Sequence, residues 1–319
     1  MRPAADQLGI QLEILYADRD HLKMLEQAES VSQRSGLPDY VVLVNEKQSG
    51  VMAMSFFKNS PVKIMLLHND LTQQQRDEAG NERGLIKNWI GTLTTDEYKV
   101  SLLLIKALSS HCSKAVEAVG LSGIKSNPVS LEREAGLGDF FLDPTRGRLL
   151  QIVHADWSYA EGKDRAARLL ERYPDLNVIW AANDAMAVGA LDAAKEAGKG
   201  TVIAIGGQGG FPAALERIRS GELKATVGGT AMTGAWALVL LYDYHHGLDF
   251  ANDVGLHYKP DHATVIDSPE KAKKFGSIVI EHPDRIDFRS FSKVFTPKLE
   301  HYDFRYEKVL EAAGETPAR

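Results

Sequence analysis

Polar and aromatic side chains follow several apolar runs of this chain, at points where a strand is expected to end. Asn183 follows the run VIWAA, Gln208 stands within IAIGGQGGF, and His68 and Asn69 follow VKIMLL. Trp157 lies in HADWSYAEG, again directly after an apolar run. Open α/β sheets bind ligands outside the carboxyl ends of their parallel strands. These five positions are therefore candidate contacts for a small molecule.

Arg133 is a sixth candidate because of its place near the start of an expected helix over residues 131–141. A cation gains nothing from the helix dipole at that end, so an aimed contact explains it better. The planar guanidinium fork suits two neighbouring hydroxyl groups. The alternative is a surface arginine that pairs with Glu132 or Glu134.

The other candidates also have structural alternatives. Trp157 offers an aromatic face for stacking on a ligand ring, or it covers the core. Asn183 precedes an expected helix, so it caps that helix, contacts a ligand, or does both. His68 and Asn69 either face a ligand or open a polar loop through an Asx-turn. The glycines on both sides of Gln208 would let the backbone approach a ligand closely.

Sequence motifs for nucleophilic catalysis, zinc binding and nucleotide binding are absent. The sequence has no GxSxG, HExxH or GxxxxGK[ST] motif, and the loop at Gln208 lacks the GxGxxG spacing of dinucleotide sites. The single cysteine, Cys112, stands beside His111 with no acidic partner nearby in sequence. We therefore expect no catalytic residues, no metal ligands and no cofactor. The net charge of -6 and the absence of a Lys/Arg cluster exclude a nucleic-acid footprint.

Strand and helix patterns alternate along the chain. This alternation is typical of parallel sheets covered by helices on both faces, and 319 residues suffice for two such lobes. We therefore predict an α/β fold of two doubly wound lobes, with the polar stretch 68–84 as a loop. Strands are predicted at 11–16, 40–45, 62–67, 88–93, 116–121, 149–154, 177–182, 201–206 and 223–228. Helices are predicted at 21–35, 50–59, 96–114, 131–141, 162–172, 185–197 and 212–220.

The first residues have the character of a helix end. Ala4–Gly9 matches the last turns of a helix closed by glycine, and Gln11–Tyr16 then alternates like a half-buried strand. In a doubly wound sheet of order 2-1-3-4-5, a strand that follows a helix has the place of strand two. We expect a first strand and most of a first helix ahead of Met1. The alternative is that the fold begins with this strand and that the preceding residues form a tail.

Residues 171–230 resemble the ligand-binding lobe of the type I periplasmic sugar-binding proteins. That group includes ribose-binding and autoinducer-binding proteins and the effector domains of lac-repressor-type regulators. The resemblance extends from about residue 4 to 259, and AANDAMAVGAL and SLEREAGLGDFF carry it most specifically. The latter is similar to the family's Arg-x-x-Gly-aromatic element, with Leu137 at the aromatic position.

Two positions depart from that family's pattern. Gln208 stands where the family usually has Asp, and Gly229 stands where ribose binders carry Gln. An amide both accepts and donates hydrogen bonds, whereas a carboxylate only accepts them. We expect the ligand to differ from a plain pentose.

The resemblance implies a solute-binding protein of the periplasm, without enzymatic activity, that holds a sugar or sugar-like molecule between two lobes and closes on it by hinge motion. The implied ligand contacts are Arg133, Trp157, Asn183, Gln208, His68 and Asn69. The first lobe would comprise residues 1–94 and 230–258, and the second 95–229 and 259–290, joined by three crossings. Residues 291–319 would form an extension that wraps a lobe or docks a partner.

The resemblance also implies binding partners and alternative functions for this chain. We expect a monomer that presents its ligand to the membrane permease of an ABC importer or to a sensor kinase, and that does not bind nucleic acid. The family's secretion signal would precede Met1 together with the first strand. The main rival is the effector domain of a lac-repressor-type regulator without its DNA-binding module. Further rivals are an NAD-type oxidoreductase, for which no phosphate-binding first turn is found, and a remnant that binds nothing.

Overall fold

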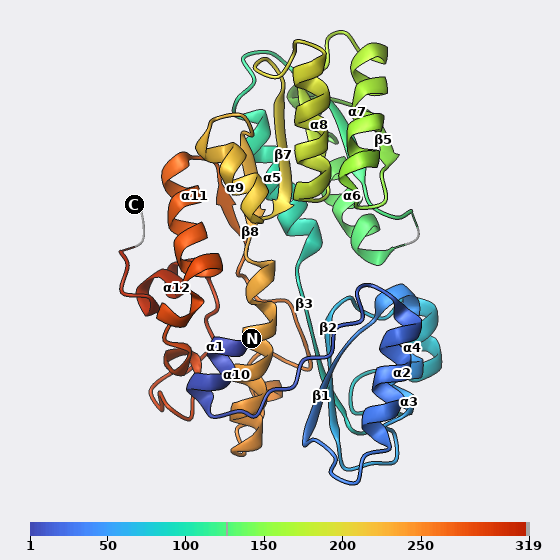
Figure 1. The fold of residues 1–319 in the computed structure, drawn as a ribbon, viewed down its shortest axis with the longest axis vertical. Helices are drawn as coiled ribbons and strands as arrows, with labels where there is room; N and C mark the ends of the chain where they lie inside the picture. The colour runs from blue at the N-terminus through green and yellow to red at the C-terminus, as the bar shows by residue number, and fades with distance from the viewer. Residues whose placement is uncertain (126, 317–319) are drawn as a thin grey trace. The chain divides into compact units, whose positions relative to one another are not determined.

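Parallel β-sheets flanked by helices form both of the units into which the chain divides, as the predicted α/β fold class requires (Figure 1). The computed structural model describes residues 1–125 and 127–316. Unit 1 comprises Met1–Thr95, Met232–Asp261 and Asp284–Arg319, and unit 2 comprises Asp96–Ala231 and His262–Pro283. None of the helices within the described ranges has the length and apolar character needed to cross a bilayer.

Unit 1 contains a four-stranded parallel sheet of order β1-β2-β3-β9. Helices α2, α3 and α4 cover one face of this sheet, and α10 covers the other with α1 packed against it (Figure 1). Apolar strand residues and the fully buried Trp89 form the core beneath the first group of helices. The strands are β1 Tyr40–Val44, β2 Lys63–His68, β3 Trp89–Thr94 and β9 His257–Tyr258. The helices are α1 Arg2–Leu8, α2 His21–Ser32, α3 Gly50–Ser55, α4 Gln73–Ala79, α10 Thr233–His245 and α12 Tyr306–Ala312.

The strand predicted at Gln11–Tyr16 is wrong. These residues belong to neither sheet, although half-buried and exposed positions still alternate over much of the segment. The segment bonds instead to α2 and the residues after it: the Tyr16 carbonyl accepts from Gln27 Nε2 (3.1 Å), and Glu13 pairs with Arg34 (2.6 Å). A strand needs a neighbour for its backbone groups, and β1 is paired only with β2 within the described chain.

Two other local predictions at this end of the chain have opposite outcomes. The helix end predicted before residue 10 is confirmed, because α1 closes at Gly9 with a left-handed φ of 70°. The loop predicted over residues 68–84 is wrong in part, because it contains α4. A capping box starts that helix: the Thr72 hydroxyl accepts from Gln75 N, and the Gln75 side chain accepts from Thr72 N.

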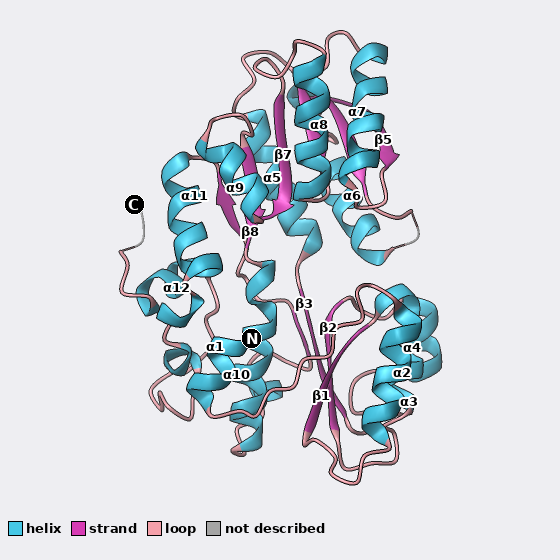
Figure 2. Ribbon diagram, viewed as in Figure 1, coloured by secondary structure: helices cyan, strands magenta, loops and turns pink. Residues whose placement is uncertain are grey.

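Unit 2 contains a six-stranded sheet of order β10-β8-β7-β6-β4-β5, parallel except for the edge strand β10. Helices α5 and α6 lie on one face, and α7, α8 and α9 on the other (Figure 2). The strands are β4 Val116–Ser122, β5 Gly147–His154, β6 Val178–Ala181, β7 Ala204–Gly209, β8 Ala225–Gly228 and β10 Thr264–Ile266. The helices are α5 Glu97–Ser109, α6 Pro128–Phe140, α7 Tyr159–Arg172, α8 Asp184–Glu196, α9 Pro212–Arg219 and α11 Pro269–Phe275.

The C-terminal segment from residue 284 onward belongs to unit 1. The chain passes between the units at 95/96, 231/232, 261/262 and 283/284, which is one passage more than the three predicted, and the boundary predicted at 290 falls at 283. Aromatic packing explains the return: the ring centroids of Phe291 and Phe304 lie 4.9 and 4.6 Å from that of Trp236 on α10. The described part of this segment, up to residue 316, therefore packs on α10 of unit 1.

A buried carboxylate fastens the same segment. Asp243 on α10 is fully buried and accepts hydrogen bonds from Ser292 Oγ (2.5 Å), Lys293 N (2.7 Å) and Tyr302 OH (2.8 Å). Hydrogen bonds to a charged acceptor are stronger than neutral ones, so these contacts fix the segment on α10.

Candidate functional site

The four predicted contact residues of unit 2 lie at or beyond the carboxyl ends of its strands or face them from α6. Trp157 contacts both Arg133 and Asn183: the Arg133 guanidinium lies 5.5 Å from the centre of the Trp157 ring, and Asn183 Nδ2 donates to the Trp157 carbonyl (3.0 Å). Gln208 stands near the end of β7, the strand beside β6, which Asn183 follows. The structure thus brings together side chains that are up to 75 positions apart in the sequence.

Arg133 is held from α6 in a buried ion pair. Its Nε and Nη2 atoms each lie 2.6 Å from Glu97 Oε2, and Nη1 donates to the Ala182 carbonyl. The side chain is about nine-tenths buried, so the predicted alternative of a surface pair with Glu132 or Glu134 is wrong. Asn127 caps α6 and Asp96 caps α5, which sets where each helix presents its charged partner.

The indole of Trp157 packs closely on the backbone at Gly123. A Cβ atom placed on Gly123 would lie 2.1 Å from Cε2 and Cζ2 of the indole, so only glycine leaves room for this ring. Trp157 itself has a left-handed φ of 61°, which turns the chain directly after β5. Its Nε1 is buried and has no hydrogen-bond partner among the described residues. Buried Trp N–H groups usually find a partner, so this donor can serve a ligand.

Asn183 performs the predicted capping. Its Oδ1 accepts from Met186 N (2.8 Å) at the start of α8, and its Nδ2 holds the loop of Trp157 through the carbonyl described above. The amide therefore joins the N-terminus of α8 to the aromatic candidate. A direct contact between Asn183 and a ligand stays a prediction.

Gln208 is almost completely buried, with 2% of its surface exposed. Neither its Oε1 nor its Nε2 has a hydrogen-bond partner within residues 1–125 and 127–316. Leaving a buried amide unpaired costs on the order of 1–3 kcal/mol, and native structures tolerate few such groups. This side chain requires one donor and one acceptor from elsewhere.

Sequence reasoning missed Glu97, Asp184 and Thr226. Asp184 is 2% exposed, and burial raises the pKa of its carboxyl to about 6 even though Thr226 Oγ1 (2.6 Å) and Phe211 N (2.8 Å) donate to it. An acidic residue directly after the predicted helix cap Asn183 was the available signal. Glu97 offered none, because its partner is 36 residues away.

The unit 1 candidates lie at the end of β2. His68 closes the strand with a left-handed φ of 64°, and Asn69 N donates to the Leu67 carbonyl (2.8 Å). Asp70 accepts from Leu71 N (2.7 Å) and pairs with Arg76 (2.6 Å). The Asp70 carboxylate bonds to the next residue, whereas an Asx-turn bonds two residues on, so both the Asx-turn and a ligand contact from this loop stay predictions.

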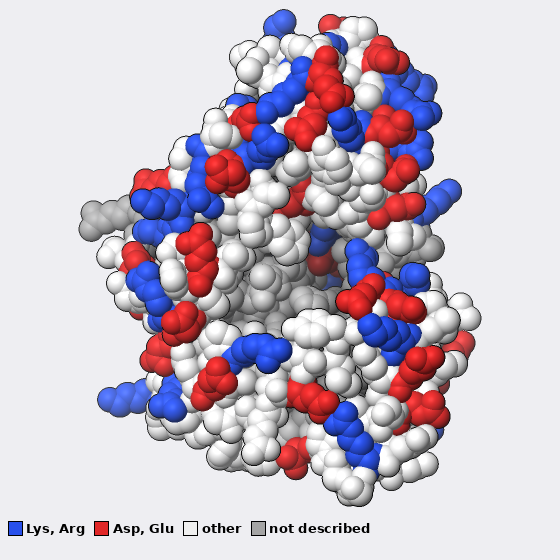
Figure 3. Space-filling model, in the orientation of Figure 1, with Lys and Arg blue, Asp and Glu red and all other residues white. Residues whose placement is uncertain are grey.

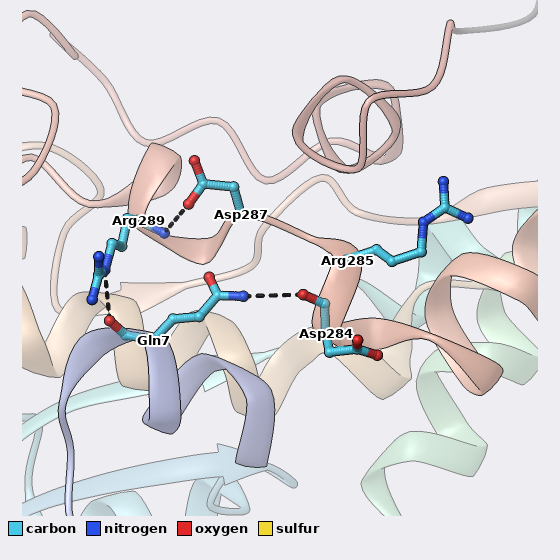
Figure 4. Close-up of a pocket in the computed structure, with 5 residues that line it drawn as sticks. All are labelled: Gln7, Asp284, Arg285, Asp287 and Arg289. Carbon is cyan, nitrogen blue, oxygen red and sulfur yellow. Dashed lines mark hydrogen bonds between the residues drawn. The ribbon is translucent and has the colours of Figure 1, made fainter.

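A surface pocket in unit 1 differs in character from these sites. Gln7, Asp284, Arg285, Asp287 and Arg289 line it (Figure 4). Both ends of the Gln7 side-chain amide and its backbone carbonyl are hydrogen-bonded. Nε2 donates to the Ile286 carbonyl (2.8 Å), Oε1 accepts from Phe288 N (2.7 Å), and the backbone carbonyl of Gln7 accepts from Arg289 Nε (2.6 Å). These groups fasten α1 to the C-terminal segment and are not free to bind a ligand.

Other chemistries find no support among the described residues. Within that part of the chain no cluster of His, Cys, Asp and Glu could hold a metal ion. Burial raises the pKa of the Cys112 thiol, which disfavours a nucleophilic thiolate. Lys/Arg and Asp/Glu side chains are interspersed on the face of each unit seen in Figure 3. Trp89, Trp180 and Trp236 are fully buried and belong to the core.

A family model for the periplasmic binding protein domain matches residues 1–248. The chain belongs to this family. A solved structure of a periplasmic sugar-binding protein from Pseudomonas fluorescens is 30% identical with a TM-score of 0.83, and the match covers 99% of this chain and 93% of that one. A solute-binding protein from Actinobacillus succinogenes with bound D-allose has a TM-score of 0.74 at 20% identity, covering 86% and 92%.

Curated relatives point the same way. The D-allose-binding periplasmic protein of Escherichia coli is 31% identical over 128 residues, which is 40% of this chain and 41% of that protein. The ribose import binding protein RbsB of Salmonella typhimurium is 25% identical over 224 residues, 70% of each. The predicted family, and with it a solute-binding rather than an enzymatic protein, is confirmed. None of the proteins named here is a transcription regulator, so the rival effector domain gains no support.

Proposed function

We propose that this protein binds a sugar or sugar-like molecule at the carboxyl ends of β6 and β7 in unit 2. The observation that carries the proposal is the buried, unpaired amide of Gln208 at the end of β7. A hydroxyl group both donates and accepts, so two sugar hydroxyls would satisfy both atoms of this amide. The allose-binding and ribose-binding relatives described above support the same ligand class.

The neighbouring residues would complete this half of the site. The indole of Trp157 would stack on the C–H face of the sugar and donate from Nε1. The Arg133 guanidinium, oriented by its ion pair with Glu97, would donate to sugar oxygens. Asn183 would contact the ligand beside its capping bond. From unit 1, His68 and Asn69 are proposed as further contacts.

We further propose that the protein acts in the periplasm as a monomer and presents its ligand to the membrane permease of an ABC importer, with a sensor kinase as the second candidate partner. The family and the import role in the relatives' names support the importer. Closure by hinge motion, expected from the family resemblance, stays a prediction.

Thermal unfolding with a panel of pentoses, hexoses, polyols and furanosyl sugars tests the binding function. A ligand at 100 times its dissociation constant adds roughly 2.7 kcal/mol to the free energy of unfolding, which shifts the midpoint clearly. We expect one class of sugar to give this shift in the wild type and not in Arg133→Ala. The control is Arg165→Ala, which removes a surface arginine of the same unit that pairs only with exposed carboxylates on its own helix.

Gln208→Leu separates a ligand contact from a structural role. Leucine has a similar size and removes the unpaired amide, so the unliganded variant should unfold at a higher temperature than the wild type. The same variant should lose the sugar-induced shift. A variant that is less stable without ligand yet keeps the shift would show that Gln208 serves the fold and not the ligand.

A further inference from the structure

Asp184 ties together three segments of unit 2 beneath the turn that carries Gln208. Its Oδ1 accepts from Thr226 Oγ1 on β8 (2.6 Å), and its Oδ2 accepts from Phe211 N (2.8 Å), just before α9. Gly210 N donates in turn to Thr226 Oγ1 (3.3 Å). The carboxylate itself is in the first turn of α8. The path from β7 to α9 is thus bonded to a single buried group.

The glycines of this turn make room for that carboxylate. A Cβ on Gly207 would lie 2.6 Å from Asp184 Oδ1, and a Cβ on Gly209 would lie 3.1 Å from Oδ2. Gly207 and Gly209 therefore let the backbone rest on Asp184, and between them Gln208 is the only residue with a side chain. Asp184 therefore fixes the backbone on both sides of Gln208, and this backbone in turn fixes the position of the Gln208 side-chain amide.

We propose that Asp184 is a positioning residue for ligand binding: its ionised carboxylate holds the 206–211 turn so that the Gln208 amide faces the sugar, and its protonation loosens the turn and weakens binding. The inference rests on the proposed function for its ligand, but the ordering of the turn can be measured without one.

The charges and donors around Asp184 set the pH at which this happens. Burial raises the pKa of its carboxyl to about 6, while the hydroxyl of Thr226, the amides of Phe211 and Gly210, and the positive charge of Arg133 on α6 hold it down. These are the groups that face the carboxylate from β8, the β7–α9 turn and α6. A protonated oxygen accepts fewer hydrogen bonds, so one tie to the turn is lost below about pH 6. The Asp184 carboxyl itself stays buried beneath the loosened turn, whereas global unfolding exposes it.

Amide hydrogen exchange of Gly210 and Phe211 in the ligand-free, full-length protein tests the inference, after correction for the intrinsic pH dependence of exchange. In the wild type, protection should fall at least tenfold between pH 7.5 and pH 5. In Asp184→Asn, a side-chain NH2 group takes the place of one carboxylate oxygen and cannot accept a hydrogen bond from the backbone. The protection of the two amides should therefore be low at both pH values. Thr226→Val should raise the pH at which half of the protection is lost, because the Asp184 carboxylate loses a hydrogen-bond donor. Thr226→Ser should restore the wild-type pH midpoint. Glu196→Gln, which changes an exposed acid at the far end of α8, is the matched control and should behave as the wild type.

Binding of D-allose, measured by titration calorimetry, provides the second readout. Affinity should fall at least tenfold from pH 7.5 to pH 5 in the wild type and should be pH-independent in Asp184→Asn. If D-allose binds at neither pH, the proposed ligand is wrong for this sugar, while the exchange data still decide the role of Asp184. If Asp184→Asn fails to fold, the shifted midpoint of Thr226→Val carries the test. Protection that does not change with pH in the wild type would overturn the inference.

Discussion

Replacing Gly123 with alanine should displace Trp157 and weaken ligand binding while leaving the fold intact. The added Cβ would lie 2.1 Å from two indole carbons, whereas ordinary contacts are 3.4–4 Å, so the ring must move by about 1.5 Å or more. Gly123 does not have a left-handed φ, so alanine fits its backbone. The perturbation is therefore steric and directed at one side chain.

The expected loss combines two interactions. Moving the indole removes its contact with the Arg133 guanidinium, which is worth about 0.5–2 kcal/mol. It also removes stacking on the ligand, worth about 0.5–1.5 kcal/mol. Together these give about 1–3.5 kcal/mol, or roughly a 5- to 300-fold loss of affinity. Overpacking should lower the free energy of unfolding by about 1–3 kcal/mol.

Titration calorimetry and tryptophan fluorescence measure this result. Trp157 is the only half-buried tryptophan, since the other three are fully buried, so a change in the emission maximum reports on it. The matched control is Gly138→Ala in α6, where a Cβ meets nothing within 4 Å and helix propensity should add about 0.5–1 kcal/mol of stability. Unchanged affinity in Gly123→Ala together with a red-shifted Trp157 emission would refute the stacking role.

Three further variants test other parts of the account. Gln7→Ala should lower the free energy of unfolding by about 1–3 kcal/mol in a urea titration, because Phe288 N and the Ile286 carbonyl lose their partner. The control Gln74→Ala, at an exposed position of α4, should change the free energy of unfolding by no more than about 0.5 kcal/mol. Asp243→Ala should cost about 3–5 kcal/mol by chemical denaturation, since three buried donors lose a charged acceptor; a smaller cost than that of Gln7→Ala would contradict this. Burial raises the pKa of the Asp184 carboxyl from 3.8 to about 6. Between pH 3.8 and pH 6 the native state therefore holds a proton that the unfolded state has released, so raising the pH lowers the free energy of unfolding. The stability of the wild type minus that of Asp184→Asn should therefore fall by about 2.4 kcal/mol from pH 4 to pH 7; a rise would refute the burial of this charge.

The sequence predicted much of the fold because the signals were local. The apolar strands before His68, Asn183 and Gln208 and the amphipathic helices between them have clear periodicity, and glycine at position 9 marked the end of a helix. The strand at 11–16 was predicted from the same periodicity. It failed because a strand also depends on a neighbour that supplies backbone partners, which a local pattern cannot show.

Long-range partners were the other limit. Arg133, Trp157, Asn183 and Gln208 were found from their places after strands or near a helix start, but the pairing of Arg133 with Glu97 depends on how α5 packs against α6. The return of residues 284–316 to α10 likewise depends on aromatic contacts with Trp236 that no sequence spacing encodes.

A crystal structure with the sugar that gives the largest thermal shift tests the central claim most directly. The account predicts that the Gln208 amide lies 2.7–3.2 Å from two sugar oxygens and that the sugar ring stacks on the Trp157 indole. A sugar bound elsewhere, with the Gln208 amide still unpaired, would contradict it.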